Sequence, residues 1–551
     1  MERRKIFYKM LVPDSQGYLL LERIINMRGE KSIFFLVKIG LLTAIAIGII
    51  FGATSHKQTI EWKNDTLWLN FCRRNAQICI WENENGTFHF FLPSFANNNT
   101  FFWKDDEFEL VVNQATVEKK FTFDTNSTYE VSIISIFSQE PIWEGNVAFH
   151  KSNNIPTIML DMDEANYQIL QNEKGQKVSA TIRTITKNGN IDYEQDLSWI
   201  KLRGNTTREC EKKSYGLKLQ QKERFLNIGN AREWVLLANY FDDTKMKNEL
   251  TLNLASASGI PYVPKTKWAD LYINGVYQGN YLVTEKVGAE FDSKNTLPFN
   301  ASTETGIPYV EGWTKGYDYQ YKDINLDVTY LLEKDLPAYY VSEDCGLITP
   351  RLNTFTLKTP QLASREQMEF LQDIVQKIDL LMEARDESVW YYLDAASLSQ
   401  KYILDEMSMN PDANVTSAFF YKKQGDNILF AGPPWDYDMA YGNTGDMQEL
   451  AKGTILNIRE MRGEDDSLDW YNALAEMQSG RDTIRKEYEK MRPYYVLLVE
   501  EKIDTKKEYI KDSVLMDQIR WEKEETDFDE QVDLLKSFLM QRIQMMDNWY
   551  S

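Results

Sequence analysis

Residues 432–442 read Gly-Pro-Pro-Trp-Asp-Tyr-Asp-Met-Ala-Tyr-Gly, the most informative stretch of the chain. Two carboxylates, Asp436 and Asp438, stand one residue apart after an apolar run at 428–431. If that run is a strand, side-chain alternation places both carboxylates on one face and turns Trp435 and Tyr437 inward. Paired oxygen ligands at this spacing suit Mg²⁺ or Mn²⁺ that also holds phosphate oxygens. The alternative is a surface turn with two solvated carboxylates.

Charge and histidine content narrow the possible chemistry. The chain has 551 residues, with 83 acidic against 62 basic side chains and a net charge of −21. This balance argues against a nucleic-acid-binding surface, which needs basic patches. Its three histidines, His56, His89 and His150, all precede residue 151. A histidine-based zinc site or a Ser-His-Asp triad is therefore excluded downstream, where chemistry must use carboxylates, Lys, Arg, amides or hydroxyls.

The four cysteines form no Cys-x-x-Cys motif, so a zinc knuckle or a thioredoxin-like site is not expected. Cys72 and Cys79 fall on what look like facing strands of a hairpin. If this part of the chain lies outside the cytoplasm, the pattern allows a disulfide between them but does not require one.

An apolar run at residues 32–53 is long enough to span a bilayer. Seven Lys or Arg residues precede it within 1–31. By the positive-inside rule, 1–31 is then a cytoplasmic tail, and residues from about 56 onward are extracytoplasmic. The sequence thus predicts a single-pass cell-membrane protein anchored through its N-terminal helix. The alternative is a cleaved signal peptide with a weak site at 53–55.

The remainder of the chain changes from strand-like to helix-like patterns. Residues 57–150 alternate short apolar and polar stretches, which predicts a small β-sandwich. Strand patterns continue from 157 to about 290, with a tight hairpin at Asn274-Gly275. An irregular segment is expected over 288–350, with one strand near 328–333. Helical periodicity dominates after 364. We therefore expect an α+β domain over 155–551 with the outline of a two-lobed enzyme.

Two segments in the strand-rich half carry candidate phosphate ligands. A predicted strand at 198–202 leads into a polar loop around Gly204, whose backbone N–H groups and hydroxyls could bind phosphate. An ordinary turn is the alternative. The next strand places Lys212 and Lys218 on one face. A later strand ends in Glu285 and Lys286.

One more segment completes the set. A predicted helix at 394–409 ends in a turn with Asp412 and Asn414, which precedes a strand at 418–422 and then the Asp-x-Asp stretch. Taken together and in this order, these segments resemble the spore-coat protein H (CotH) kinase family from about Ile155 to the C-terminus. The seven collinear marks are Leu202–Arg208, Trp234–Asp242, Leu271–Gly279, Thr284–Lys286, Tyr330–Glu333, Leu357–Pro360 and Gly432–Gly442.

The resemblance implies an atypical, kinase-like phosphotransferase that uses ATP with Mg²⁺ or Mn²⁺. Asp436 and Asp438 would hold the metal ion, and Asp412 would accept or position the proton of the substrate hydroxyl. Lys218 would contact the α/β-phosphates with Glu285 as its partner, although Lys213 or Lys286 could replace it. The residues expected over the phosphates are Arg203, Asn205 and Thr206, with Arg208 and Lys358 as lesser candidates.

Some of these residues have a purely structural role as the alternative to a functional one. Arg203 and Asp242 could simply form a buried ion pair, and Trp435 is expected to be a core residue.

Three functions stay open at this point. The first is an extracytoplasmic protein kinase that phosphorylates Ser or Thr hydroxyls of surface or coat proteins. The second is a catalytically silent surface protein that uses the same fold to bind partners. The third is a metal-dependent glycosyltransferase, because Asp-x-Asp also grips sugar-nucleotide diphosphates. The absence of Rossmann-like alternation before the motif counts against this third function.

Overall fold

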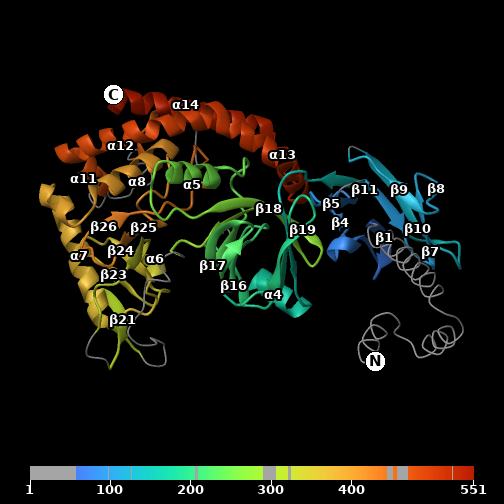
Figure 1. Cartoon of the computed structure of the whole chain (residues 1–551), viewed down its shortest axis with the longest axis horizontal. Helices are drawn as coiled ribbons and strands as arrows, with labels where there is room; N and C mark the ends of the chain where they lie inside the picture. Colours follow the sequence, from blue (N-terminus) through green and yellow to red (C-terminus); the bar gives the residue numbers. More distant parts are fainter. Residues whose placement is uncertain are drawn as a thin grey trace, which may run out of the picture.

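The computed structural model describes residues 58–96, 99–125, 127–204, 209–288, 306–320, 324–443, 451–455, 470–523 and 525–550. These residues form a mixed α+β fold with four β-sheets. The sheets follow one another along the long axis of the molecule, and helices α12, α13 and α14 run along one side (Figure 1). No helix of the described residues is long and apolar enough to cross a membrane. The predicted anchor at 32–53 lies outside these residues.

Residues 58–151 form two sheets around one hydrophobic core. The first has the order β3 (Ala76–Cys79), β2 (Thr66–Phe71), β1 (Gln58–Lys63), β6 (Thr100–Trp103) and β9 (Lys120–Thr122). The second has the order β4 (Trp81–Glu82), β5 (Thr87–Leu92), β11 (Pro141–Lys151), β10 (Thr128–Ser135), β7 (Phe108–Val112) and β8 (Ala115–Thr116). Their shared core also takes in Tyr272, Tyr277 and Met516 from the rest of the chain.

The disulfide that the sequence allows in this part is not formed. Cys72 and Cys79 are both free thiols. Cys79 lies opposite Trp68 in the β2–β3 ladder, whereas Cys72 lies in the short turn that joins the two strands. The two cysteines therefore do not face each other across the hairpin.

An eight-stranded sheet follows. Its order is β14 (Ile191–Asp196), β13 (Thr181–Ile185), β12 (Thr157–Asp161), β18 (Thr266–Ile273), β19 (Val276–Glu285), β17 (Ile228–Leu237), β16 (Ser214–Phe225) and β15 (Trp199–Arg203). Asn274-Gly275 joins β18 to β19 as the predicted hairpin, with positive φ at both residues. One face of this sheet carries an apolar core that includes Leu217 and Trp234.

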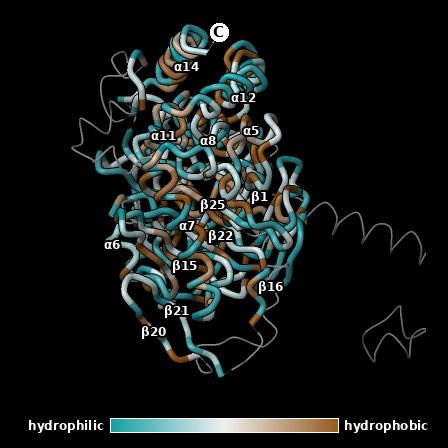
Figure 2. Tube along the Cα trace, turned by 90° about the vertical axis from the view of Figure 1, so that its left-hand side faces the viewer, coloured by the Kyte–Doolittle hydropathy of each residue, from teal (hydrophilic) through white to brown (hydrophobic). Residues whose placement is uncertain are grey.

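The last sheet contains seven strands. Its order is β20 (Ile307–Glu311), β21 (Thr314–Asp318), β23 (Gly346–Ile348), β24 (Thr354–Thr359), β22 (Tyr330–Lys334), β25 (Ala418–Lys422) and β26 (Leu429–Ala431). The described part of 288–350 supplies four of these strands. β22 matches the strand predicted near 328–333, whereas β20, β21 and β23 make the segment more regular than expected. Figure 2 shows hydrophobic segments around β22 and β25 in the interior of the molecule.

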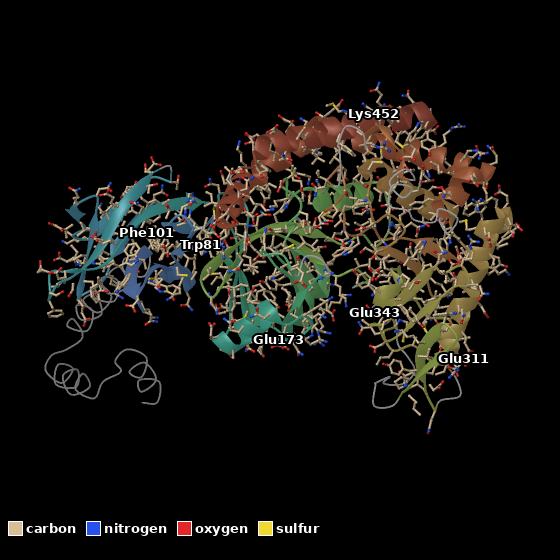
Figure 3. All side chains as sticks on the ribbon, turned by 180° about the vertical axis from the view of Figure 1, so that it is seen from behind. Trp81, Phe101, Glu173, Glu311, Glu343 and Lys452 are labelled. Atoms are coloured by element: carbon tan, nitrogen blue, oxygen red, sulfur yellow. The ribbon has the colours of Figure 1, made fainter. Side chains whose placement is uncertain are left out.

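Helices surround the sheets. They are α4 (Glu164–Asn172), α5 (Lys247–Ala257), α6 (Pro337–Tyr340), α7 (Arg365–Ala384), α8 (Ala395–Ser408), α11 (Trp470–Glu476), α12 (Gln478–Leu497), α13 (Ile503–Arg520) and α14 (Phe528–Tyr550). Local sequence explains the starts of two of the predicted helices: Ser364 forms a capping box with Gln367 at α7, and Asp394 caps α8. Figure 3 places Phe101 and Glu311 near opposite ends of the molecule.

The eight- and seven-stranded sheets meet across a small apolar cluster. Val235 of β17 packs there with Leu331, Phe419, Tyr421 and Trp435 from the other side. Because residues two apart on a strand share a face, Glu233 points to the same side as Val235. The side of the eight-stranded sheet that faces the seven-stranded sheet therefore carries charged residues beside this cluster.

Candidate active site

The Asp-x-Asp stretch follows β26 and is held on both sides by hydrogen bonds. Trp435 and Tyr437 are buried, as alternation predicts, and Asp436 and Asp438 take the other phase. The Tyr437 N–H donates to Asn248 Oδ1 of α5 at 2.7 Å, and its hydroxyl donates to Asp405 Oδ1 of α8 at 2.6 Å. The two carboxylates are thus fixed by their buried neighbour.

Asp436 adopts a left-handed backbone with φ of 68°. Such a conformation is uncommon outside glycine and is often found at functional sites. It occurs here in a segment whose neighbours are buried and bonded.

Asp438 forms an acidic cluster with three other carboxylates, Asp242, Asp412 and Asp436. Burial raises the pKa of Asp438 to about 8, and the charges of Asp436, Asp242 and Asp412 act in the same direction. Burial also raises the pKa of Asp436, which Arg203 and a 3.4 Å hydrogen bond from Ser417 partly offset. Such a concentration of negative charge favours a cation. Among the described residues, however, no group of three or more His, Cys, Asp or Glu side chains is arranged to hold a metal ion.

Asp412 reaches this cluster from the loop after α8. Its backbone O accepts hydrogen bonds from the N–H groups of Val415 (3.1 Å) and Thr416 (3.2 Å). The Thr416 hydroxyl donates to Asp335 at 2.5 Å, next to β22. Since Ser417 of the same loop bonds Asp436, the predicted catalytic and metal-binding residues are brought together.

Arg203 faces the acidic cluster from the end of β15. Its guanidinium lies over the ring of Trp435, 5.5 Å from the centroid, and the carboxylates of Asp436 and Glu333 act on its charge. Its Nη1 is buried and makes no hydrogen bond within the described residues. Asn205, Thr206 and Arg208, the other predicted residues of this loop, lie outside the described residues.

The predicted Arg203–Asp242 ion pair is wrong. The Asp242 carboxylate instead accepts hydrogen bonds from Thr244 N–H (2.9 Å), Thr244 hydroxyl (2.6 Å) and Lys247 N–H (2.8 Å). It thereby satisfies the N-terminus of α5. Trp435 is a core residue, as expected.

Lys218 pairs with Glu233, and the expected pair with Glu285 is wrong. Lys218 lies opposite Glu233 in the β16–β17 ladder, and their charged groups are 2.8 Å apart. Glu285 lies opposite Trp234 and so points to the other face of the sheet. Its carboxylate accepts hydrogen bonds from the N–H groups of Asn230 and Lys265.

Lys286 also pairs with Glu233, at 2.7 Å. Burial alone would raise the pKa of Glu233, but Lys286 and Lys218 outweigh it and lower that pKa to about 2. Two of the predicted phosphate ligands therefore share one carboxylate. Lys212 does not join them, because β16 begins at Ser214 and Lys212 lies before it.

Sequence reasoning missed several members of the site. Lys247 is buried in the first turn of α5, and Asp242, Asp243 and Asp438 are the carboxylates closest to its ammonium. Glu333 of β22 bonds Lys358 at 2.8 Å, and burial raises its pKa to about 7. The sequence did contain a signal for Lys247. The first turns of α5 hold four polar residues next to the apolar Leu250 and Leu252.

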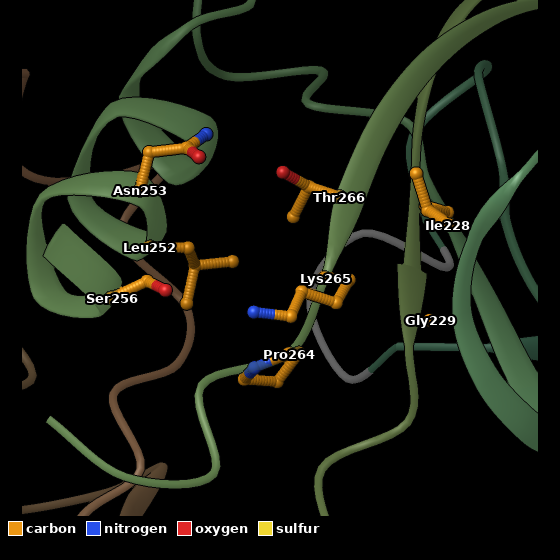
Figure 4. A pocket seen from close by; sticks show the side chains of 8 residues that line it. All are labelled: Ile228, Gly229, Leu252, Asn253, Ser256, Pro264, Lys265 and Thr266. Carbon is orange, nitrogen blue, oxygen red and sulfur yellow. The ribbon is translucent and has the colours of Figure 1, made fainter. Parts of the chain in front are cut away.

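A separate cavity of about 190 Å³ lies between α5 and the starts of β17 and β18. Figure 4 shows Lys265 reaching into it toward α5. Its lining is Ile228, Gly229, Leu252, Asn253, Ser256, Pro264, Lys265 and Thr266. None of the acidic cluster lines it, so this cavity is distinct from the candidate active site.

Comparison with known families identifies the chain. Residues 200–546 match the family described as CotH kinase protein. The chain belongs to the CotH kinase family. The match includes every residue of the acidic cluster and the basic residues that face it, and it extends through α13 and most of α14. A comparison with curated proteins finds none that matches.

Proposed function

We propose that this CotH kinase family member is a protein kinase that transfers the γ-phosphoryl group of ATP to Ser or Thr hydroxyls of surface or coat proteins. The observation that carries the proposal is the convergence of Asp412, Asp436 and Asp438 opposite Arg203, between two sheets that we interpret as the two lobes of a kinase-like fold. Phosphoryl transfer needs mainly positioning and charge neutralisation, and this arrangement offers both.

The donor set fits a hard divalent cation. Asp436 and Asp438 would hold Mg²⁺ or Mn²⁺, because both offer carboxylate oxygens in a site crowded with negative charge. The ion would neutralise charge on the nucleotide phosphates. Asp412 would accept the proton of the substrate hydroxyl.

Arg203 would contact phosphate oxygens, because its buried Nη1 makes no hydrogen bond within the described residues. Lys218 and Lys286, now paired with Glu233, would bind phosphates further along the same face of the sheet. Asn205 and Thr206 belong to the same proposal.

Transfer of label from γ-labelled ATP to protein tests this function. The full chain is incubated with Mg²⁺ or Mn²⁺ and a mixture of surface proteins, alongside Asp436→Asn and Asp412→Asn. Asp533→Asn, an exposed residue on α14, is the matched control. We expect metal-dependent labelling that both active-site variants abolish and the control retains.

Other outcomes would favour the alternatives. Absence of labelling, with no thermal shift by ATP and metal, would contradict the kinase and support a binding protein. A thermal shift by a UDP- or GDP-sugar with Mn²⁺, but not by ATP, would support the glycosyltransferase.

We further propose that residues 32–53 anchor the protein in the cell membrane and that the described part is extracytoplasmic. The apolar run and the basic residues before it support this orientation. Cys72 offers a test, because its thiol is exposed and free. A membrane-impermeant maleimide should label intact cells through Cys72, and Cys72→Ser should lose that labelling. Labelling only after cell lysis would contradict the orientation.

A further inference from the structure

One carboxylate of α13, Asp517, lies between two lysines in the interior of the protein. Its Oδ1 is 2.5 Å from Lys212 Nζ, and its Oδ2 is 3.2 Å from Lys245 Nζ. Side-chain exposure is 2% for Asp517, 0% for Lys212 and 2% for Lys245. The Asn280 N–H donates a hydrogen bond to Oδ1 at 2.9 Å, which is the third polar contact of this carboxylate. All three charged groups are therefore removed from water.

The two lysines belong to two different segments that carry or adjoin residues of the candidate active site. Lys212 lies between the end of β15, which carries Arg203, and the start of β16. Its ammonium also donates to the backbone O of Ala238 and Asn280. Lys245 lies in residues 239–246, which we call the acidic loop because it carries Asp242.

The side chain of Asn443 bridges the acidic loop and the Asp-x-Asp stretch. Asn443 Nδ2 donates to Phe241 O at 2.5 Å and to Asp438 O at 3.1 Å. Lys245 Nζ donates to Asn239 O at 3.2 Å, which closes the loop on itself. A displacement of this loop would therefore be transmitted to Asp438.

Asp517 of α13 is needed to balance the charge of the two buried lysines. The two buried ammonium groups repel each other, and the pKa of Lys212 is lowered to about 7 by its burial, although Asp517 acts against this shift. Removing one partner from a buried ion pair leaves an uncompensated charge and is strongly destabilising. Without Asp517, the two lysines lose both their buried counter-charge and the contacts that hold their segments to α13.

The surrounding backbone is shaped to admit this carboxylate. Gly279 of β19 has φ of 110°, and a Cβ there would lie 2.2 Å from Asp517 Oδ1. Trp521 Nε1 and Arg520 Nε donate to the backbone O of Gln278 (3.1 Å) and Tyr277 (2.9 Å). The end of α13 is thus bonded to β19 next to the ion cluster.

We propose that Asp517 is a positioning residue for phosphoryl transfer: delivered by α13, its carboxylate fixes the acidic loop and the segment before β16, and so completes the active site. The effect on rate rests on the proposed kinase function, whereas the effect on loop order does not.

Hydrogen-exchange mass spectrometry and kinetics on the full chain test this inference. In Asp517→Asn we expect amide exchange of residues 239–247 and 209–214 to rise by an order of magnitude or more, with exchange in β18 unchanged. We expect kcat to fall on the order of 100-fold, because a small misplacement of catalytic groups lowers the rate by about this factor.

The matched control is Asp270→Asn. Asp270 is another buried carboxylate bound to α13, through Ser513 at 2.6 Å, but it contacts no lysine. It should leave exchange in both loops and kcat near wild type. Wild-type exchange and kcat in Asp517→Asn would overturn the inference, as would equal loop exchange in the two variants.

A second variant covers the case in which Asp517→Asn does not fold. Lys212→Met leaves Lys245 and Asp517 as a one-to-one pair, so the fold should survive. We expect faster exchange at residues 209–214 with residues 239–247 still protected. Unchanged exchange at 209–214 would overturn the inference. If the wild-type chain shows no phosphotransfer, the proposed function fails while these exchange results still decide the role of Asp517.

Discussion

The hydroxyl of Tyr437 donates a 2.6 Å hydrogen bond to Asp405, and this bond ties the Asp-x-Asp stretch to α8. Asp405 is fully buried and also accepts bonds from Tyr471 (2.6 Å) and Lys401 (2.7 Å). Because Tyr437 stands between Asp436 and Asp438, the position of both carboxylates depends on this contact. The hydrogen bonds that converge on Asp405 of α8 thereby set the geometry of the site.

Tyr437→Phe should reduce both stability and metal-dependent activity. Loss of a hydrogen bond to a buried carboxylate costs about 1.5–3 kcal/mol of the free energy of unfolding. Tyr471→Phe removes an equal bond to Asp405 outside the acidic stretch and should cost a similar amount. Urea unfolding should show comparable losses, whereas the metal concentration needed for half-maximal phosphotransfer should rise only in Tyr437→Phe. The same rise in both variants would contradict the positioning role of Tyr437.

Arg203→Met should weaken ATP binding. A charge-assisted hydrogen bond contributes about 1.5–3 kcal/mol, which corresponds to roughly 10- to 100-fold in Kd. Titration calorimetry with ATP and Mg²⁺ would measure the change, and Arg203→Lys should recover part of it. Arg224→Met, an exposed residue at the far end of β16, is the control and should bind as wild type. Equal affinity of Arg203→Met and wild type would remove Arg203 from the site.

Asp270 should make stability depend on pH. Burial raises its pKa from 3.8 to about 6, while Ser513, Ser152 and Tyr277 hydrogen bonds act against the shift. The folded protein therefore holds a proton that the unfolded chain releases, so this group's contribution is fully present below pH 4. It is lost as pH rises to about 6, by about 3 kcal/mol at about 1.4 kcal/mol per pKa unit.

Asp270→Asn should remove that dependence. Relative to wild type, the variant should gain free energy of unfolding between pH 4 and pH 6 and level off above it. Urea unfolding at several pH values would measure the difference. A difference that does not vary with pH would show that Asp270 is not protonated in the folded protein.

Arg542→Met should destabilise the C-terminal helix packing. Arg542 of α14 and Glu406 of α8 are both fully buried and form a 2.8 Å ion pair, and Arg542 also donates to the backbone O of Ala451 and Gly453. Removing one partner should cost about 3–5 kcal/mol. Denaturant unfolding checks this, with Arg492→Met as the control, since its pair with Asp547 is partly exposed. Equal losses would contradict the expectation.

Local patterns predicted many of the elements but fewer of the contacts. The strand at 418–422 and the inward phase of Trp435 and Tyr437 follow from apolar runs and alternation, and both are confirmed. β17 was missed because its first half, Ile-Gly-Asn-Ala-Arg, lacks a strand pattern. The partner of Lys218 depends on the register between β16 and β17, which no local pattern states. Asp517 could not be linked to Lys212, because only the folded chain brings α13 to β19.

The order of the chain gives α13 a biological consequence. Every residue of the acidic cluster is synthesised well before Asp517, which lies near the C-terminal end. Until that helix emerges and docks, Lys212 and Lys245 have no buried counter-charge, so a nascent or prematurely terminated polypeptide carries all the reactive side chains without their working arrangement. Under the proposed function, phosphotransfer would therefore begin only after α13 has been synthesised and has docked, later than the synthesis of every residue in the acidic cluster.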